Sequence, residues 1–166
     1  MAKSNPDVEM INAPNMLQIK IGGPLGPADL QMVEKAEEAL KDMRANFQQW
    51  LEEEVEKLEQ AGASVKDAGL KGEEGENLFI RAHDLRGVGT TYEFPIITRL
   101  AASLGKMLDI PEKRQKASKH LALAHVAAIR AALSQNIRDD EDQVALALAV
   151  ELENQSAEFT KPWKDN

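Results

Sequence analysis

The sequence predicts an all-α protein, an antiparallel four-helix bundle with an irregular N-terminal arm and a long first helix. Apolar residues recur at spacings of three and four along most of the chain, which is the period of an amphipathic helix. Aromatic residues make up only 4% of the sequence, while Ala and Leu are plentiful and favour helices. No segment alternates apolar and polar residues as a strand does. The expected division is an arm at 1–27, the helical bundle at 28–160 and a frayed tail at 161–166.

The arm, residues 1–27, contains four of the seven prolines and three of the ten glycines. Its one apolar patch is MLQIKI at 16–21. The helical pattern begins after Pro27 and predicts a first helix over 28–60, ended by the glycine-rich stretch 62–75. The apolar positions of this helix are Leu30, Val33, Leu40, Met43, Phe47, Trp50, Leu51, Val55 and Leu58.

A second helix is predicted from Glu73 or Glu76 to Tyr92, and a third over 95–108. The boundary between them depends on Pro95. A proline inside a helix removes a backbone hydrogen bond, but it suits the first turn of a new helix.

Pro111 begins the fourth predicted helix, over 111–137. A fifth helix is expected over 140–158, with Asp139 or Asp140 as its N-terminal cap. The predicted core positions are Ala117, Leu121, Ala124, Ala128 and Ala131 on the fourth helix, and Val144, Leu148 and Leu152 on the fifth.

Composition and charge exclude several classes of protein. The length of 166 residues suits a single domain, and 28 acidic against 20 basic residues give a net charge of -8. Nucleic-acid binding needs a positive surface and is not expected. The absence of cysteine excludes disulfides, Cys-ligated zinc and thiol nucleophiles. Neither a signal peptide nor a membrane span is recognised, so the cytoplasm is the expected location, with no membrane partner.

The segment ENLFIRAHDLRGVGTTYEFP (76–95) carries the most distinctive chemistry. At about 100° per residue, one continuous stripe of the predicted second helix faces the bundle. The members of this stripe are Leu78, Ala82, Leu85, Gly89 and Tyr92. His83 lies on the opposite side of the helix and is therefore expected to point to solvent.

The neighbours of this histidine are unusual for an exposed helix face. Phe79 lies one turn before it and Gly87 one turn after it, while Ile80, Arg86 and Thr90 share the same side. Apolar residues exposed beside an ionisable group suggest a docking surface. A glycine inside a helix costs about 1 kcal/mol relative to alanine, and it is tolerated where another molecule must approach closely. From the residues alone, a histidine without function and apolar neighbours that pack under the arm remain open.

The segment resembles the signature of histidine phosphotransfer (HPt) domains of two-component phosphorelays. In that signature the histidine is followed by a basic residue at the third place and glycine at the fourth, which are Arg86 and Gly87 here. The continuation GVGTTYEFP resembles the GxGxxFGFP type found in some of these domains, with Glu93 where glycine is usual. The residues that fit this continuation are Gly89, Thr90, Thr91, Tyr92, Phe94 and Pro95. The resemblance covers about 73–158, and the arm has no counterpart in it.

The resemblance implies a phosphoryl carrier rather than a turnover enzyme. His83 would accept a phosphoryl group from the phospho-aspartate of one response-regulator receiver domain and pass it to another; a hybrid histidine kinase is a further candidate partner. Arg86 would contact the phosphoryl oxygens, and Gly87 would leave space for the receiver. The partner contacts implied on the same face are Phe79, Ile80 and Thr90. No cofactor or metal is expected in this chain, because the receiver brings its own Mg²⁺, and a monomer is expected.

The main alternative is a non-catalytic helical interaction module that keeps the HPt shape, or a regulator that binds a receiver domain. Such a module usually loses the histidine, which this chain retains. His120 and His125 lie about 140° apart around a helix, so packing or a surface position is expected for them rather than a metal site. The crowded carboxylates of the first helix are expected to form a solvated face: Glu52, Glu53, Glu54, Glu56 and Glu59. Self-association through Trp50 and Leu51 is the alternative to a monomer.

Overall fold

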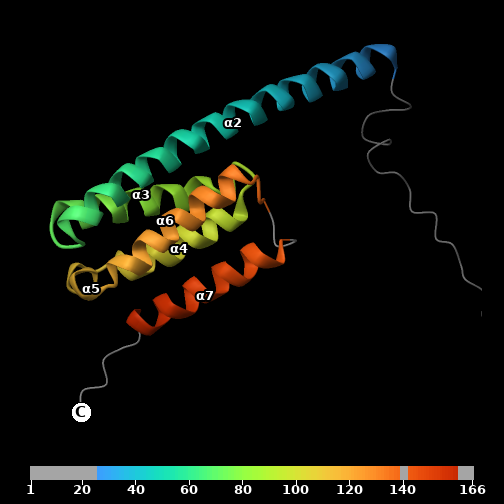
Figure 1. Cartoon of the computed structure of the whole chain (residues 1–166). Helices are drawn as coiled ribbons and strands as arrows, with labels where there is room; N and C mark the ends of the chain where they lie inside the picture. The colour runs from blue at the N-terminus through green and yellow to red at the C-terminus, as the bar shows by residue number, and fades with distance from the viewer. Residues whose placement is uncertain (1–25, 139–141, 161–166) are drawn as a thin grey trace, which may run out of the picture. The chain divides into compact units, whose positions relative to one another are not determined.

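The structure is a computed structural model that describes residues 26–138 and 142–160. Within these residues the chain forms six helices, α2 to α7, and no strand (Figure 1). The all-α prediction is therefore confirmed. Most of the predicted arm, with its patch at 16–21, and the predicted tail lie outside the described residues. The two proposed cap residues, Asp139 and Asp140, also lie outside them.

The first helix, α2, is Pro27–Ala68. The chain divides into two units within this helix, residues 1–42 and residues 43–166. The described part of the first unit is Gly26 and the opening turns of α2, and the side chains of these turns are all exposed. The apolar residues predicted for this part of the helix are therefore not buried against any of the described residues.

In the second unit α2 contributes one buried stripe to the core. Its members are Leu51, Val55, Leu58, Ala61, Gly62 and Val65. The helix runs past the predicted end at residue 60 because Gly62 packs inward, where an added Cβ would lie 3.4 Å from the side chain of Val126. It ends just before Gly69, whose φ of 88° lies in the left-handed region that commonly terminates helices.

The helix that carries the candidate histidine, α3, is Glu73–Val88, and α4 is Pro95–Leu108. The third predicted helix has the bounds expected for it. The second ends at Val88 rather than Tyr92, although the Tyr92 N–H still donates to the Val88 carbonyl at 3.0 Å. Helix α4 packs against α3 on one side and against α6 and α7 on others, which places it at the centre of the second unit (Figure 1).

The turn between α3 and α4 contains Glu93, whose φ of 64° lies in the left-handed region that glycine favours. Its carboxylate forms ion pairs with Arg44 and with Arg138, each at 3.1 Å. An exposed ion pair contributes at most about 1 kcal/mol, and a non-glycine residue in this conformation costs about 1–2 kcal/mol. The two ion pairs act against the backbone strain, and the turn keeps a glycine-like geometry without glycine.

The predicted helix over 111–137 is wrong, because this segment forms two helices, α5 at Pro111–Lys116 and α6 at Lys119–Ser134. The break occurs at Ala117, whose ψ of 149° is extended. The hydroxyl of Ser118 then caps α6 by accepting a hydrogen bond from the backbone N–H three residues later, at 3.2 Å. A serine at this position was the sequence signal for the start of α6.

The buried face of α6 also differs from the prediction. Leu121 and Ala128 are buried as expected, but Ala124 is exposed, and the two remaining predicted alanines are only half-buried. The largest buried side chains of α6 are those of His125 and Ile129. Alanine is small enough to lie on either side of a helix, so the spacing of alanines did not identify the face that is buried.

The last helix, α7, is Gln143–Thr160. Its cap is Asp142, whose carboxylate accepts hydrogen bonds from the Val144 and Ala145 N–H groups at 3.0 and 2.9 Å. Val144 and Leu148 are exposed, so two of the three predicted core positions were wrong. The residues buried on α7 are Ala149, Leu152 and Ser156. Small side chains let α7 approach α4 and α6 closely.

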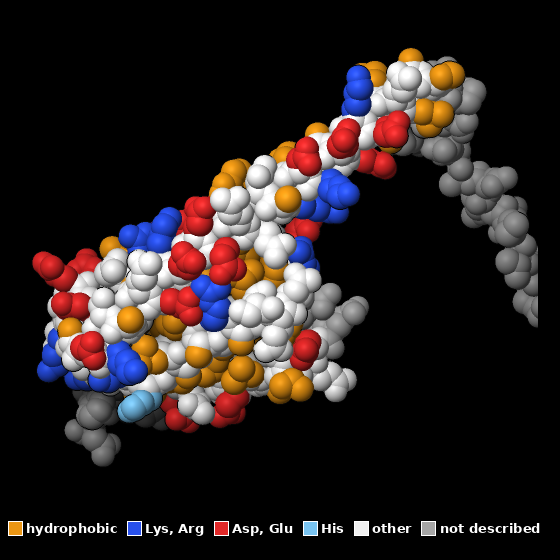
Figure 2. Space-filling model, turned by 45° about the horizontal axis from the view of Figure 1, so that its top comes forward, with side chains coloured by type: hydrophobic (Ala, Val, Ile, Leu, Met, Phe, Trp, Pro, Cys, Tyr) orange, Lys and Arg blue, Asp and Glu red, His pale blue; other side chains and the backbone are white. Residues whose placement is uncertain are grey.

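Charged side chains cover much of the surface. Figure 2 shows acidic and basic groups interspersed on the face that it presents. Two of the crowded carboxylates on α2 bind Arg130 of α6: Glu59 at 2.5 Å, and Glu52. Both carboxylates remain partly exposed, as the prediction of a solvated face requires, and they also hold α2 to α6. None of the helices described is long and apolar enough to cross a membrane.

Candidate functional site

His83 lies on the outer side of α3, immediately after the buried Ala82. Its side chain is 61% exposed, whereas Leu78 and Leu85 on the opposite side of the helix are fully buried. The helical spacing of apolar residues predicted this arrangement correctly. The imidazole can therefore be reached by another molecule.

The closest charged group to this imidazole belongs to Asp84, whose Oδ1 lies 3.9 Å from Nδ1 of His83. This distance is too long for a hydrogen bond, so the carboxylate acts on the imidazole through its charge alone. Asp84 was not among the predicted site residues, and the sequence signal for it was its place directly after the histidine.

Phe79 is half-buried and packs against the core, with its ring centroid 6.2 Å from that of His83. The guanidinium of Arg114 lies 5.5 Å from the same ring. Arg114 is itself buried and donates from Nε to the Leu108 carbonyl at 2.9 Å. The ring of Phe79 is thus held by its own chain, and only part of it is available to a partner.

Arg86 and Gly87 lie one turn after the histidine, and both are exposed. Among the residues that the structure describes, the guanidinium of Arg86 makes no hydrogen bond or ion pair. A Cβ added at Gly87 would meet no atom within 4 Å. Glycine costs about 1 kcal/mol in a helix relative to alanine, so its presence here has no packing reason in the described chain.

Gly89, in contrast, is required by packing. A Cβ at this position would lie 2.5 Å from Oγ1 and 2.9 Å from the backbone nitrogen of Thr98 on α4. The absence of a side chain lets the end of α3 approach α4. Gly87 and Gly89 are close in the sequence but differ in their surroundings. Gly89 is required by the packing of α3 against α4, whereas the space beside Gly87 is open to solvent.

The two remaining predicted contact residues are also exposed. Ile80 is 44% exposed on the outer side of α3. Thr90 lies where α3 meets α4, with its hydroxyl 3.0 Å from that of Thr98. All six predicted site residues thus lie on the outer part of α3 or its end, with Phe79 the least accessible of them.

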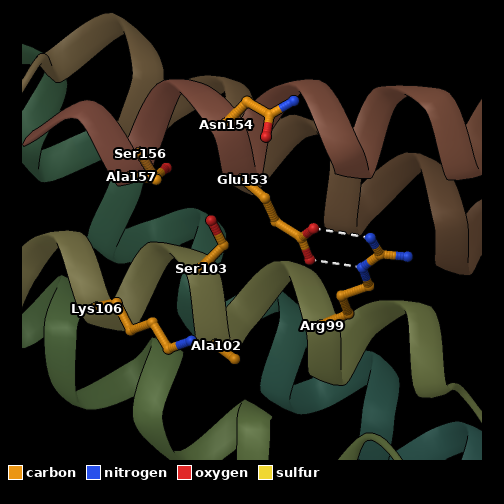
Figure 3. A pocket seen from close by; sticks show the side chains of 8 residues that line it. All are labelled: Arg99, Ala102, Ser103, Lys106, Glu153, Asn154, Ser156 and Ala157. Carbon is orange, nitrogen blue, oxygen red and sulfur yellow. Dashed lines mark hydrogen bonds and ion pairs between the residues drawn. The ribbon is translucent and has the colours of Figure 1, made fainter. Parts of the chain in front are cut away.

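A pocket of about 520 Å³ between α4 and α7 is a second candidate site. Figure 3 shows its polar side chains, among them Arg99, whose Nε and Nη2 donate to the carboxylate of Glu153 at 2.5 and 2.7 Å. Ser103 and Ser156 also line it, and both hydroxyls are engaged in hydrogen bonds within the protein. Because the Arg99–Glu153 pair joins α4 to α7 across it, we describe the pocket as a polar seam between these two helices.

Beneath this seam lies His125, which is fully buried. Its Nδ1–H donates to the Leu121 carbonyl at 2.8 Å, because a carbonyl oxygen can only accept. The Ser156 hydroxyl donates to the Leu152 carbonyl at 2.8 Å, which leaves the Ser103 hydroxyl to donate to Nε2 at 3.0 Å. His125 thus ties α6 to α4 in the neutral form. Packing, one of the two roles expected for it, is what the structure shows.

Lowering the pH from about 7.5 to about 5.5 is expected to destabilise the fold through His125. Burial lowers the pKa of this imidazole, more than its hydrogen bond to Leu121 and the charge of Glu153 raise it. The unfolded chain then binds the proton more tightly, so stability present above the ordinary pKa of about 6.5 is lost as the pH falls. Thermal unfolding at the two pH values measures this loss.

The His125→Gln variant is the control for this experiment, because a glutamine amide can accept the Ser103 hydroxyl bond but does not titrate. It is expected to be less stable at neutral pH and to show a smaller loss on acidification. An equal loss in the variant and the wild type would assign the pH dependence to other groups.

Among the described residues, no three His, Asp or Glu side chains come together as a metal site. His120 is exposed and His125 is buried, so the two do not face a common space. Comparison with protein-family models, with curated proteins and with solved structures finds no match for this chain. Its function must therefore be inferred from the residues and geometry of the site itself.

Proposed function

We propose that this chain is a histidine phosphotransfer protein, in which His83 carries a phosphoryl group between receiver-domain aspartates. The observation that carries this proposal is the open space at Gly87, one turn from an exposed imidazole. A helical glycine that the described chain does not require leaves room for a second protein to approach the histidine. The resemblance of HDLRG to the HPt signature supports the same assignment.

The fold proposed to present this site is a four-helix bundle of the HPt type. Its four main helices are α3, α4, α6 and α7, which lie almost entirely within the 73–158 stretch covered by the resemblance, and the long helix α2 precedes them. The contacts of α4 with α3, α6 and α7 support this arrangement, and the ion pairs from Arg130 of α6 join α2 to it.

The proposed reaction is an in-line displacement on phosphorus. The Nε2 lone pair of His83 attacks the aspartyl phosphate of a receiver, the P–O bond to the aspartate breaks, and its electron pair leaves with the carboxylate. The ring gains positive charge, which Asp84, 3.9 Å from Nδ1, would stabilise. The guanidinium of Arg86 offers a planar fork of donors to the phosphoryl oxygens.

In this proposal the chain is a carrier rather than a turnover enzyme. The partners are response-regulator receiver domains, with a hybrid histidine kinase as a further donor, and the receiver supplies the Mg²⁺ for transfer. The carrier acts as a monomer in the cytoplasm. Charge supports a protein partner over a nucleic acid, since the chain has a net charge of -8.

The test is incubation of the purified chain with radiolabelled, phosphorylated receiver domains of the source organism. The proposal expects label on the chain that is labile in acid and stable in alkali, as phosphohistidine is. A receiver that binds without transferring label would instead identify a non-catalytic interaction module. Absence of label from every receiver would reject the phosphocarrier.

A further inference from the structure

A second surface feature lies beside His83, on the side of α3 that faces α2. It is a groove of about 610 Å³, called here the Trp50 groove. Its apolar wall consists of Trp50 from α2, Val88 from the end of α3, and Tyr92. Its charged residues are Glu53, Glu54, Arg81 and Asp84. None of these seven residues was among the predicted phosphotransfer-site residues, although Trp50 belongs to the self-association alternative.

The apolar wall is held in place by its own chain. The rings of Trp50 and Tyr92 lie 6.3 Å apart between centroids, and Phe47 stacks on Tyr92 at 5.2 Å with 28° between the ring planes. Trp50 is nevertheless 47% exposed. A large aromatic side chain that is fixed but half exposed can bind a partner with little loss of conformational entropy.

The groove borders the candidate acceptor site at Asp84. Asp84 lines the groove, and its Oδ1 lies 3.9 Å from the imidazole of His83. Arg81, two residues before the histidine, lines the groove as well. A protein seated in the groove would therefore contact Asp84, the residue beside His83.

The charge of the groove is mainly acidic, with three carboxylates against one guanidinium. One carboxylate, that of Glu54, pairs with Lys57 at 2.6 Å. Glu53 accepts only a hydrogen bond from the amide of Gln49, at 3.3 Å. Cationic side chains of a partner would therefore find unneutralised carboxylates along this groove.

We propose that the Trp50 groove is the docking site for an amphipathic helix of the receiver domain, with an apolar ridge flanked by Lys or Arg. This inference rests on the proposed function and names the surface by which the partner is selected. A cleft between two helices suits a third helix, whose ridge would contact Trp50, Val88 and Tyr92. Tryptophan is frequent among residues that dominate binding energy. The Lys or Arg residues of the receiver helix would pair with Glu53 and Asp84. The groove would therefore favour receivers whose docking helix is positively charged.

The experiment compares two groove variants with two matched controls in the full chain. Trp50→Ala removes the apolar anchor, and Glu53→Lys reverses the charge. Leu148→Ala removes an apolar side chain of similar exposure, 46%, from α7. Glu151→Lys reverses the charge of a carboxylate that accepts a hydrogen bond from the side-chain amide of Gln155, at 2.7 Å. Glu53 accepts the same kind of hydrogen bond from Gln49. Each protein is labelled by a phosphorylated receiver and, separately, by phosphoramidate, which needs no docking.

Both groove variants are expected to accept phosphate from the receiver about tenfold more slowly, or worse, than wild type. Labelling by phosphoramidate should be unchanged, and both controls should resemble wild type. The Glu53→Lys defect should shrink as salt is raised. Glu53 has no packing role, so this variant keeps the test decisive even if Trp50→Ala loosens the aromatic cluster.

Wild-type rates of receiver labelling in both groove variants would overturn the docking site while leaving the phosphocarrier intact. A wild-type chain that no receiver labels would overturn both the proposed function and this docking site. The two failures are distinguishable, because only the second one affects the wild type.

Discussion

Replacing His83 by glutamine is expected to reduce labelling by phosphorylated receivers to background. Glutamine has about the same reach but no nucleophilic ring nitrogen. Because the His83 side chain is 61% exposed and packs little, the fold should tolerate the change, with stability altered by no more than about 0.5 kcal/mol. Acid-labile, alkali-stable phosphate measures the transfer, and the far-UV circular dichroism spectrum and thermal unfolding measure the fold.

The matched control is His120→Gln, which makes the same substitution at an exposed histidine of α6. This variant should accept phosphate at the wild-type rate. Phosphohistidine retained in the His83 variant but lost in the His120 variant would move the acceptor to α6. Retention in both would contradict the assignment to either exposed histidine.

Alanine substitutions at Gly87 and Gly89 are expected to have opposite effects on stability. Gly87→Ala should stabilise the protein by about 0.5–1 kcal/mol, because its Cβ meets open space and alanine favours a helix. Gly89→Ala should destabilise it by about 1–3 kcal/mol or more, because its Cβ would collide with Thr98. Urea unfolding of the two variants measures both changes.

At Gly87, the substitution that stabilises the fold should slow the transfer of phosphate. The stabilised Gly87→Ala variant should accept phosphate from a receiver about tenfold more slowly or worse, since its methyl group occupies space proposed for the partner. Phosphoramidate should still label it normally. Wild-type transfer by Gly87→Ala would leave this glycine without a functional reason and would remove the main support for the proposed function.

The sequence was most informative where large apolar side chains define a helical face. The stripe of Leu78, Ala82 and Leu85 identified both the buried side of α3 and the exposure of His83. It was least informative where alanine dominates, because alanine spacing does not distinguish an exposed Ala124 from a buried Ala128. Helix boundaries failed for a related reason, since single residues such as Ser118 can begin a helix that periodicity alone would continue.

The part of the candidate site on α3 could be predicted from the local sequence, but the groove beside it could not. Asp84 lines this groove and follows the histidine directly, yet only its measured distance to Nδ1 gives it a role. Trp50 and Tyr92 meet because α2 and the end of α3 pack together, and nothing in their local patterns indicates that contact. Residues far apart in the chain are brought together by tertiary packing, which helical periodicity does not encode.

The ion pairs of Glu93 have a consequence for the order in which the protein folds. Glu93 connects Arg44 and Arg138, which lie 49 and 45 residues away in the sequence. Both contacts close long loops, so they require α2, the α3–α4 turn and the segment after α6 to be already in place. We expect them to form after the folding transition state, and their strength should then govern how fast the native protein opens rather than how fast it assembles.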